Sequence, residues 1–284
     1  MTPRESKLFW DIISCPRTRS SSNNPCHRII AIQNGNDCWQ VPEPWNGSLS
    51  EKFLIIGGNP AIDLKELYPA TIDVNNPSWF AMGNSGINWS NSSVETFFEE
   101  RFGFPSCHAF GAPRPYVDTT NSSILQTDGT YKRPKNDYWS IYNKICKAID
   151  STFEPWRFAI TDIVHCKSSS SKGLISATYK TCANHTKEIV DLFIQQSESS
   201  SPVIVLIGSC ANSYVDMLLD GKCISNTVIG SYDYTRGGFV QTKDIILRKY
   251  SYMDKTINIV CGIPAPSRAN GQMSNIVING HKIW

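Results

Sequence analysis

Residues 54–63 read LIIGGNPAID, an apolar run that is stopped by two glycines, an asparagine and a proline. Leu54 to Ile56 predict a buried β-strand, and the residues from Gly57 to Pro60 predict a turn at its carboxyl end. Open α/β sheets bind their ligands at this end of their strands. Asn59 is therefore either a turn residue that tolerates unusual backbone angles or a catalytic amide.

The rest of the chain alternates between apolar strands and amphipathic helices. Continuous apolar strands separated by helices are typical of a parallel sheet that is covered on both faces. The sequence therefore predicts an α/β fold, a three-layer sandwich with a central, mostly parallel sheet. Strands are predicted at 28–33, 53–56, 157–164, 202–207 and 256–261, and helices at 94–102, 138–149, 182–196 and 209–219, with Ser209 capping the last helix.

The composition places few limits on function. The 284 residues carry a formal net charge of +2, which does not indicate a nucleic-acid partner. It does not exclude one either, because attraction to phosphates needs only a local basic face. No stretch approaches the roughly 20 apolar residues that cross a bilayer. The amino terminus lacks a signal-peptide cleavage site. We expect a cytoplasmic protein with no membrane partner, whose ten cysteines are mostly reduced.

Three polar segments follow predicted strands. They are Asn59, Asp162 within ITDIVHC, and the turn PAPSRAN at 264–270. The carboxyl ends of parallel strands share one edge of a sheet, so these distant residues are expected to converge on one pocket.

In this order the motifs resemble those of the uracil-DNA glycosylase superfamily. Its first motif, a strand ending in Gly-x-Asn-Pro-Gly, is matched by GGNPA at 57–61. Other family motifs are matched by WFAMG at 79–83, TDIVHC at 161–166 and PVIVLIGSCA at 202–211. The turn PAPSRAN is nearer to Pro-Ser-Thr-Ser-Pro-Ala-Asn, found in branches acting on mismatched or deaminated purines, than to His-Pro-Ser-Pro. The resemblance covers roughly residues 50–270.

The resemblance implies an organisation and a function. Residues 1–45 would form an amino-terminal arm and lead-in, 46–275 a uracil-DNA glycosylase-like domain, and 276–284 a tail. The protein would act as a monomer on DNA in base excision repair. It would hydrolyse the N-glycosidic bond of a deaminated or damaged base flipped out of the helix. This chemistry would require no metal or cofactor.

The resemblance also assigns roles to individual residues. Asn59 matches a catalytic asparagine that orients water, a task that suits an amide although an amide is a poor base. Phe80 matches the aromatic residue that stacks on the flipped base, although it could equally be a core residue. Further base contacts fall to Gly58 and Ser267, and DNA contacts to Pro264, Arg268 and Asn270.

Two positions depart from the family pattern. Asp162 replaces the asparagine that reads the base, and an ionised carboxylate only accepts hydrogen bonds. Asp162 would therefore favour bases that present donors, unless its carboxyl is protonated; it could also simply cap a turn. Ile263 replaces the histidine that stabilises the leaving base. Ser267 or Asn270 would substitute as donors, with weaker catalysis.

Cysteines raise the question of a structural iron–sulfur cluster. Two branches of the family hold such a cluster on four cysteines, with a close first pair and a second pair about sixteen residues apart. Cys166 and Cys182 fit the second pair. No Cys-x-x-Cys precedes the first motif, although Cys15, Cys26 and Cys38 are available. The alternative is that Cys166 and Cys182 are free thiols.

Two other functions compete with glycosylase activity. One is an inactive nucleic-acid-binding relative of the same fold, because a fold does not guarantee an activity. The other is a hydrolase with Ser209 or Cys210 as its nucleophile and His165 as its base. Residues 207–211 read IGSCA and lack the second glycine of Gly-x-Ser-x-Gly, which disfavours the hydrolase.

Overall fold

The fold is that of a computed structural model, which describes residues 1–18, 25–33, 39–63, 65–71, 89–102, 116–134, 138–168, 173–266 and 273–283. The chain divides into two compact units. Unit 1 comprises Met1–Gly47, Asn59–Arg133 and Thr161–Ile189, and unit 2 comprises Ser48–Gly58, Pro134–Ile160 and Val190–Trp284.

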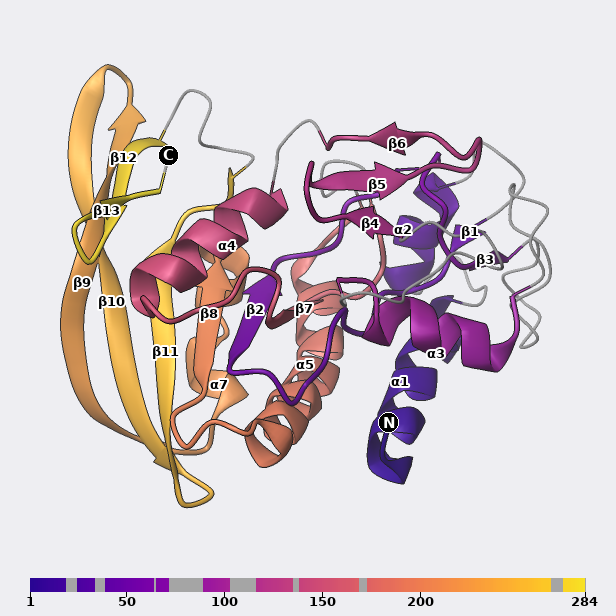
Figure 1. The fold of residues 1–284 in the computed structure, drawn as a ribbon, viewed down its shortest axis with the longest axis horizontal. Helices are drawn as coiled ribbons and strands as arrows, with labels where there is room; N and C mark the ends of the chain where they lie inside the picture. Colours follow the sequence, from indigo (N-terminus) through magenta and orange to yellow (C-terminus); the bar gives the residue numbers. More distant parts are fainter. Residues whose placement is uncertain are drawn as a thin grey trace. The chain divides into compact units, whose positions relative to one another are not determined.

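Helices and strands alternate over residues 138–212, whereas strands follow one another from residue 222 onward (Figure 1). The helices are α1 (Pro3–Ile13), η1 (Pro16–Thr18), α2 (Pro25–Ile32), α3 (Asn91–Glu99), α4 (Tyr138–Ile149), α5 (Ser176–Gln196), α6 (Gly208–Asn212) and α7 (Val215–Leu218). The strands are β1 (Trp39–Gln40), β2 (Phe53–Gly57), β3 (Ala70–Thr71), β4 (Val117–Asp118), β5 (Ser123–Leu125), β6 (Tyr131–Lys132), β7 (Phe158–Asp162), β8 (Val203–Ile207), β9 (Lys222–Arg236), β10 (Phe239–Tyr252), β11 (Lys255–Ile263), β12 (Met273–Ile278) and β13 (His281–Lys282).

The main sheet has eight strands in the order β13-β12-β9-β10-β11-β8-β2-β7. Strand β8 pairs in parallel with both β2 and β11, and the residues of β2 and β8 are almost all buried. After β2 the chain forms β7, which lies on one side of β2 in the sheet, and then β8, which lies on the other side of β2. This reversal makes the carboxyl ends of β2 and β8 a topological switch point, the place where α/β sheets bind ligands.

The other half of the sheet is antiparallel. Strands β9 and β10 form a long hairpin that pairs with β11 on one side and β12 on the other. The α/β class is therefore confirmed. The prediction of a mostly parallel sheet is corrected to a mixed sheet, because 222–252 form a hairpin where the sequence pattern had suggested no strand.

Two local predictions are wrong. The segment 28–33 was expected to be a strand, but 25–32 form helix α2, which begins at a proline. Ser209 was expected to cap a helix reaching residue 219. Instead Ile207 is the N-cap residue of α6, without a side-chain cap, and α7 follows as a separate helix. Within the described residues, no helix has both the length and the apolar character that crossing a membrane requires.

Candidate functional site

Asn59 lies directly after β2 and its turn, and Ser168 fixes its side chain. The amide nitrogen of Asn59 donates to Ser168 Oγ at 2.9 Å and to the carbonyl oxygen of Pro60 at 3.1 Å. The backbone adds a second link, because the amide of Ser168 donates to the same Pro60 oxygen. A carbonyl can only accept, so the amide nitrogen must face Pro60 and the amide oxygen of Asn59 lies on the other side.

Asp162 ends β7 and is buried, with 9% of its surface exposed. Burial raises the pKa of its carboxyl well above the ordinary value, and the nearby charge of Glu43 adds to this effect. The ammonium group of Lys167 opposes the shift without reversing it. Burial therefore favours the protonated form of this carboxyl in the folded protein, because a buried carboxyl resists ionisation. A protonated carboxyl both donates and accepts hydrogen bonds, as an amide does.

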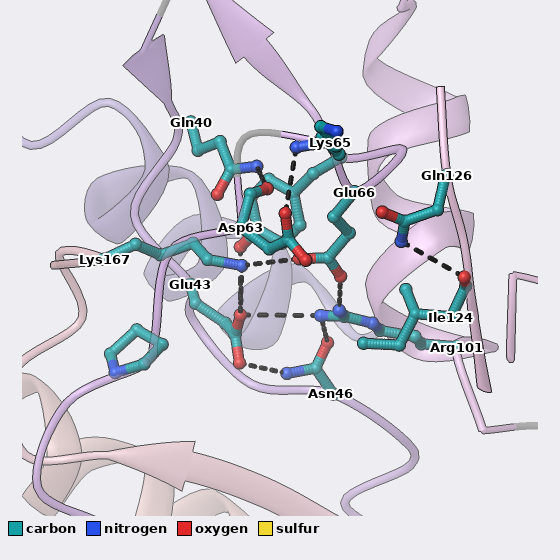
Figure 2. A network of polar contacts seen from close by, with 12 residues as sticks. Gln40, Glu43, Asn46, Asp63, Lys65, Glu66, Arg101, Ile124, Gln126 and Lys167 are labelled. Carbon is teal, nitrogen blue, oxygen red and sulfur yellow. Dashed lines mark hydrogen bonds and ion pairs between the residues drawn. The ribbon is translucent and has the colours of Figure 1, made fainter. Parts of the chain in front are cut away.

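A buried network of charges lies in unit 1 beside these segments (Figure 2). Its charged members are Glu43, Glu66, Arg101 and Lys167, and each side chain is less than a tenth exposed. Arg101 pairs with both carboxylates and also donates to Asn46 Oδ1 at 2.9 Å. Lys167 Nζ lies 3.1 Å from Glu66 and 3.7 Å from Glu43. Two positive and two negative charges therefore balance.

Tyr68 completes this network from within the core. Its hydroxyl donates to Glu43 at 3.1 Å, and Lys167 Nζ lies 3.7 Å from the centre of its ring. Burial alone would raise the pKa of Glu43, but attraction to Lys167 and Arg101 outweighs burial and lowers this pKa. Glu43 stays ionised, so its negative charge persists near Asp162.

The network fixes the segment that holds Asn59. Lys167 immediately precedes Ser168 in the sequence, and its ammonium group is tied to Glu66, which follows β2. A parallel bridge between Ala61 and Ser168 joins the same two segments through their backbones. The residues after β2 and those after β7 therefore form one connected structure.

Four thiols gather in another part of unit 1. Cys15 follows α1, Cys26 lies in α2, Cys166 follows β7 and Cys182 lies in α5. None of the four forms a disulfide, and all except Cys15 are buried. A hydrogen bond to Cys182 lowers the pKa of the Cys26 thiol. Burial raises the pKa of Cys166 well above its ordinary value, with further contributions from Cys15 and Cys26.

The structure adds Cys15 and Cys26 to the pair Cys166 and Cys182 that was predicted from the sequence. Cys166 and Cys182 interact electrostatically, and Cys15 interacts with Cys26. Cys15 and Cys26 are eleven positions apart, so their spacing does not match the close pair of the family pattern. In the described part of the chain, no three His, Cys, Asp or Glu side chains are grouped so that they could hold a metal ion as they stand.

The turn after β11 packs against the start of α6 in unit 2. Pro264 is buried, and Ala265 lies so close to Gly208 that a Cβ added there would meet Ala265 Cβ at 3.3 Å. Asn212 holds this arrangement, because its side chain accepts from the Gly262 amide and donates to the Gly208 carbonyl. Neither Asn212 nor Ser168 was predicted, since neither belongs to a motif.

The remaining predicted site residues are placed only in part. Gly58 is half-buried, and a Cβ there would lie 3.3 Å from Cys210 Cβ, so the site has little room for a larger residue. Ile263 is 1% exposed. Phe80, Ser267, Arg268 and Asn270 lie outside the described residues.

The hydrolase hypothesis gains no support from His165. Its Nδ1 lies 2.9 Å from the Glu43 carbonyl oxygen, and its Nε2 lies 3.4 Å from Thr186 Oγ1. Burial lowers the pKa of His165 to about 4, and the neighbouring His185 adds to this effect. Both ring nitrogens therefore have partners within the core of unit 1.

Comparison with protein-family models and with curated proteins finds no match to this chain.

Proposed function

We propose that this protein hydrolyses the N-glycosidic bond of a deaminated or damaged base flipped out of DNA. One observation carries the proposal: the amide of Asn59 is held by Ser168 at the carboxyl end of β2. This end belongs to the switch point of the sheet, where α/β folds bind ligands. The order of motifs shared with the uracil-DNA glycosylase superfamily supports the same function.

Asn59 would orient the attacking water. With its nitrogen committed to Ser168 and Pro60, its amide oxygen is directed to the opposite side. An amide oxygen accepts a hydrogen bond from water but does not remove a proton at neutral pH. Its contribution is therefore positional, and holding a reactant in place can supply a large part of a rate enhancement.

Asp162 would read the base as a neutral acid. Its raised pKa favours the protonated carboxyl, which would present one donor and one acceptor. This pair complements a base edge that shows a carbonyl oxygen beside an N–H, as uracil does at O4 and N3. The replacement of asparagine by aspartate therefore keeps the recognition chemistry of an amide.

Stabilisation of the leaving base is the weak point of the proposed site. Ile263 is buried and apolar where the family has a histidine, so no imidazole supports the departing base from this position. Donors from Ser267 and Asn270 would take its place, at a lower rate. The apolar Ile263 also favours the alternative function, an inactive relative that binds nucleic acid without cleaving it.

Base release from a panel of oligonucleotides tests the proposal. Single- and double-stranded substrates would carry uracil, hypoxanthine, xanthine or a mismatch, and the abasic product would be cut by alkali. We expect slow release of at least one base that presents a carbonyl beside an N–H. Binding of DNA without any abasic product would instead support the inactive relative.

We also propose that Cys15, Cys26, Cys166 and Cys182 hold a structural iron–sulfur cluster. The type of donor fits, because four thiolates are the usual ligands of such clusters, but the four side chains would have to move closer together to ligate one. Their pairwise interactions within unit 1 support the assignment. A cluster there would join the end of α1, α2, the segment after β7 and α5. It would have no part in the hydrolysis.

Absorption spectra and iron content of anaerobically purified protein test the cluster. We expect a broad band near 400 nm, and Cys182→Ser should abolish both the band and the iron. Cys223→Ser is the matched control, because Cys223 is an exposed thiol on β9. Iron-free wild-type protein without the band would refute the cluster and leave the proposed hydrolysis untouched.

A further inference from the structure

The hairpin of β9 and β10 reaches beyond the strands that flank it (Figure 1). Strand β11 pairs with β10 only from Ile246 onward, and β12 pairs with β9 no further than Tyr234. The seven residues from Ile246 back to Phe239 span about 24 Å at the rise of a β-strand. The tip therefore extends past the last residue of β11 that pairs with β10, Cys261.

The tip lies at the same end of the strands as the switch point. Strand β9 runs antiparallel to β10, and β10 runs antiparallel to β11. Strand β9 therefore runs parallel to β11 and β8, and its carboxyl end is the tip. The tip and the ends of β2, β8 and β11 consequently face the same side of unit 2.

The hairpin carries more positive charge than the rest of the chain. Residues 222–252 contain five basic and two acidic side chains, a net charge of +3, whereas the whole chain has a net charge of +2. The remaining residues therefore have a net charge of −1. Lys222, Arg248 and Lys249 lie toward the base of the hairpin, whereas Arg236 and Lys243 lie near its tip.

The two faces of the tip differ in charge. Residues that pair across two strands share a face, and successive residues alternate between faces. The pairs Arg236–Phe239, Tyr234–Gln241 and Tyr232–Lys243 therefore share one face, which we call the tip face. The acidic residues Asp233 and Asp244 pair with Thr242 and Ser231, on the opposite face.

The tip face combines cations with aromatic rings. Phe239 is 77% exposed, Arg236 and Lys243 are exposed, and both tyrosines are half-buried. Asp233 is engaged on its own face with Thr242 at 3.1 Å and Asn275 at 2.9 Å. Single-stranded nucleic acids bind to surfaces of this kind, where bases stack on aromatic rings and basic side chains follow the phosphates.

We propose that the tip face binds a single-stranded segment of nucleic acid. The choice of a nucleic acid among polyanions rests on the proposed function. The placement of Arg236 and Lys243 on the aromatic face, with Asp233 and Asp244 on the opposite face, is independent of it. The bound segment would lie on the side of unit 2 that carries the carboxyl ends of β2, β8 and β11.

The test measures binding of the full chain to a fluorescent, unmodified 20-nucleotide single strand at several salt concentrations. Gln241→Glu adds one negative charge to the tip face, and Val240→Glu adds the same charge at the neighbouring exposed position of the opposite face. We expect Gln241→Glu to weaken binding about tenfold at low salt, and Val240→Glu to have little effect. Phe239→Ala should also weaken binding about tenfold by removing a stacking surface.

Equal affinities of Gln241→Glu and Val240→Glu would overturn the proposal, as would tighter binding of a duplex of the same sequence. Absence of any binding by the wild type would also overturn it. Base release is measured separately, so the two proposals can fail separately. Loss of affinity in Gln241→Glu without base release supports the tip face and opposes the glycosylase. Base release that depends on Asn59, together with an unchanged affinity of Gln241→Glu for the single strand, supports the glycosylase and opposes the tip face.

Discussion

The side-chain nitrogen of Asn59 lies 2.9 Å from the hydroxyl oxygen of Ser168, although 109 positions separate the two residues. Ser168 is itself 2% exposed and follows Lys167, whose ammonium group is bound in the buried charge network. The position of the proposed catalytic amide therefore depends on the segment after β7. Substitutions of Ser168, Asp162 and Lys167 therefore test this part of the structure.

Ser168→Ala removes the hydroxyl that accepts from Asn59. The amide can then rotate about its side-chain bonds, so the proposed water loses its orientation. We expect kcat for base release to fall by about tenfold to a hundredfold, with a smaller change in KM. Single-turnover kinetics measure this, with Ser274→Ala, an exposed serine of β12, as the control. An unchanged kcat would show that Ser168 does not position Asn59.

Asp162→Asn tests the protonated carboxyl through the pH dependence of stability. The unfolded carboxyl ionises near pH 3.8, whereas burial keeps the folded one protonated to much higher pH. Above pH 3.8 the folded state therefore binds more protons than the unfolded state, and this residue makes stability fall as pH rises. Asparagine cannot ionise, so the variant should gain stability relative to wild type between about pH 4 and 7.

Urea unfolding at pH 4, 5.5 and 7 measures that difference. Other titrating groups, such as His165, are common to both proteins and cancel in the comparison. The variant should also keep its base preference, because an amide donates and accepts as the neutral acid does. A stability difference that does not change with pH would mean that Asp162 is ionised in the folded protein.

Lys167→Met tests the buried charge network. The substitution leaves Glu66 and Glu43 with one cation instead of two in a buried site. We expect a loss of about 3–5 kcal/mol in the free energy of unfolding, typical when one partner of a buried ion pair is removed. Thermal and urea unfolding provide the measurement.

A double variant and a surface control make this prediction specific. Adding Glu66→Gln to Lys167→Met removes one uncompensated charge and should recover part of the lost stability. Lys7→Met breaks the exposed pair with Asp11 and should change stability little. Additive losses in the double variant would mean that Lys167 and Glu66 do not interact.

The parallel half of the sheet could be predicted because its local signals agree. Helix α4 begins at Tyr138 and ends at Ile149, as the spacing of its apolar residues predicts. Strand β8, VIVLI, is apolar throughout and is fully buried. In both segments the same pattern of apolar residues indicates the secondary structure and the buried positions, so both elements could be predicted from the sequence.

Other parts depend on contacts that no local pattern contains. The apolar run in 28–33 suits a strand or a helix equally, and here a helix forms. Strand β9 is mostly exposed, so it lacks the apolar signal that identified β8. The partners Glu43, Glu66, Arg101 and Lys167 lie up to 124 positions apart, and their pairing exists only after folding.

The most direct test of the central claim is single-turnover release of free base by the wild type, Asn59→Ala and Asn121→Ala. Asn121 is an exposed asparagine bonded to Asp118, and it has no part in the proposed chemistry. We predict that Asn121→Ala releases base at the wild-type rate and that Asn59→Ala is slower by about a hundredfold. Release by Asn59→Ala at the wild-type rate would contradict the proposed site. A wild-type protein that releases no base from any substrate of the panel would contradict the proposed function.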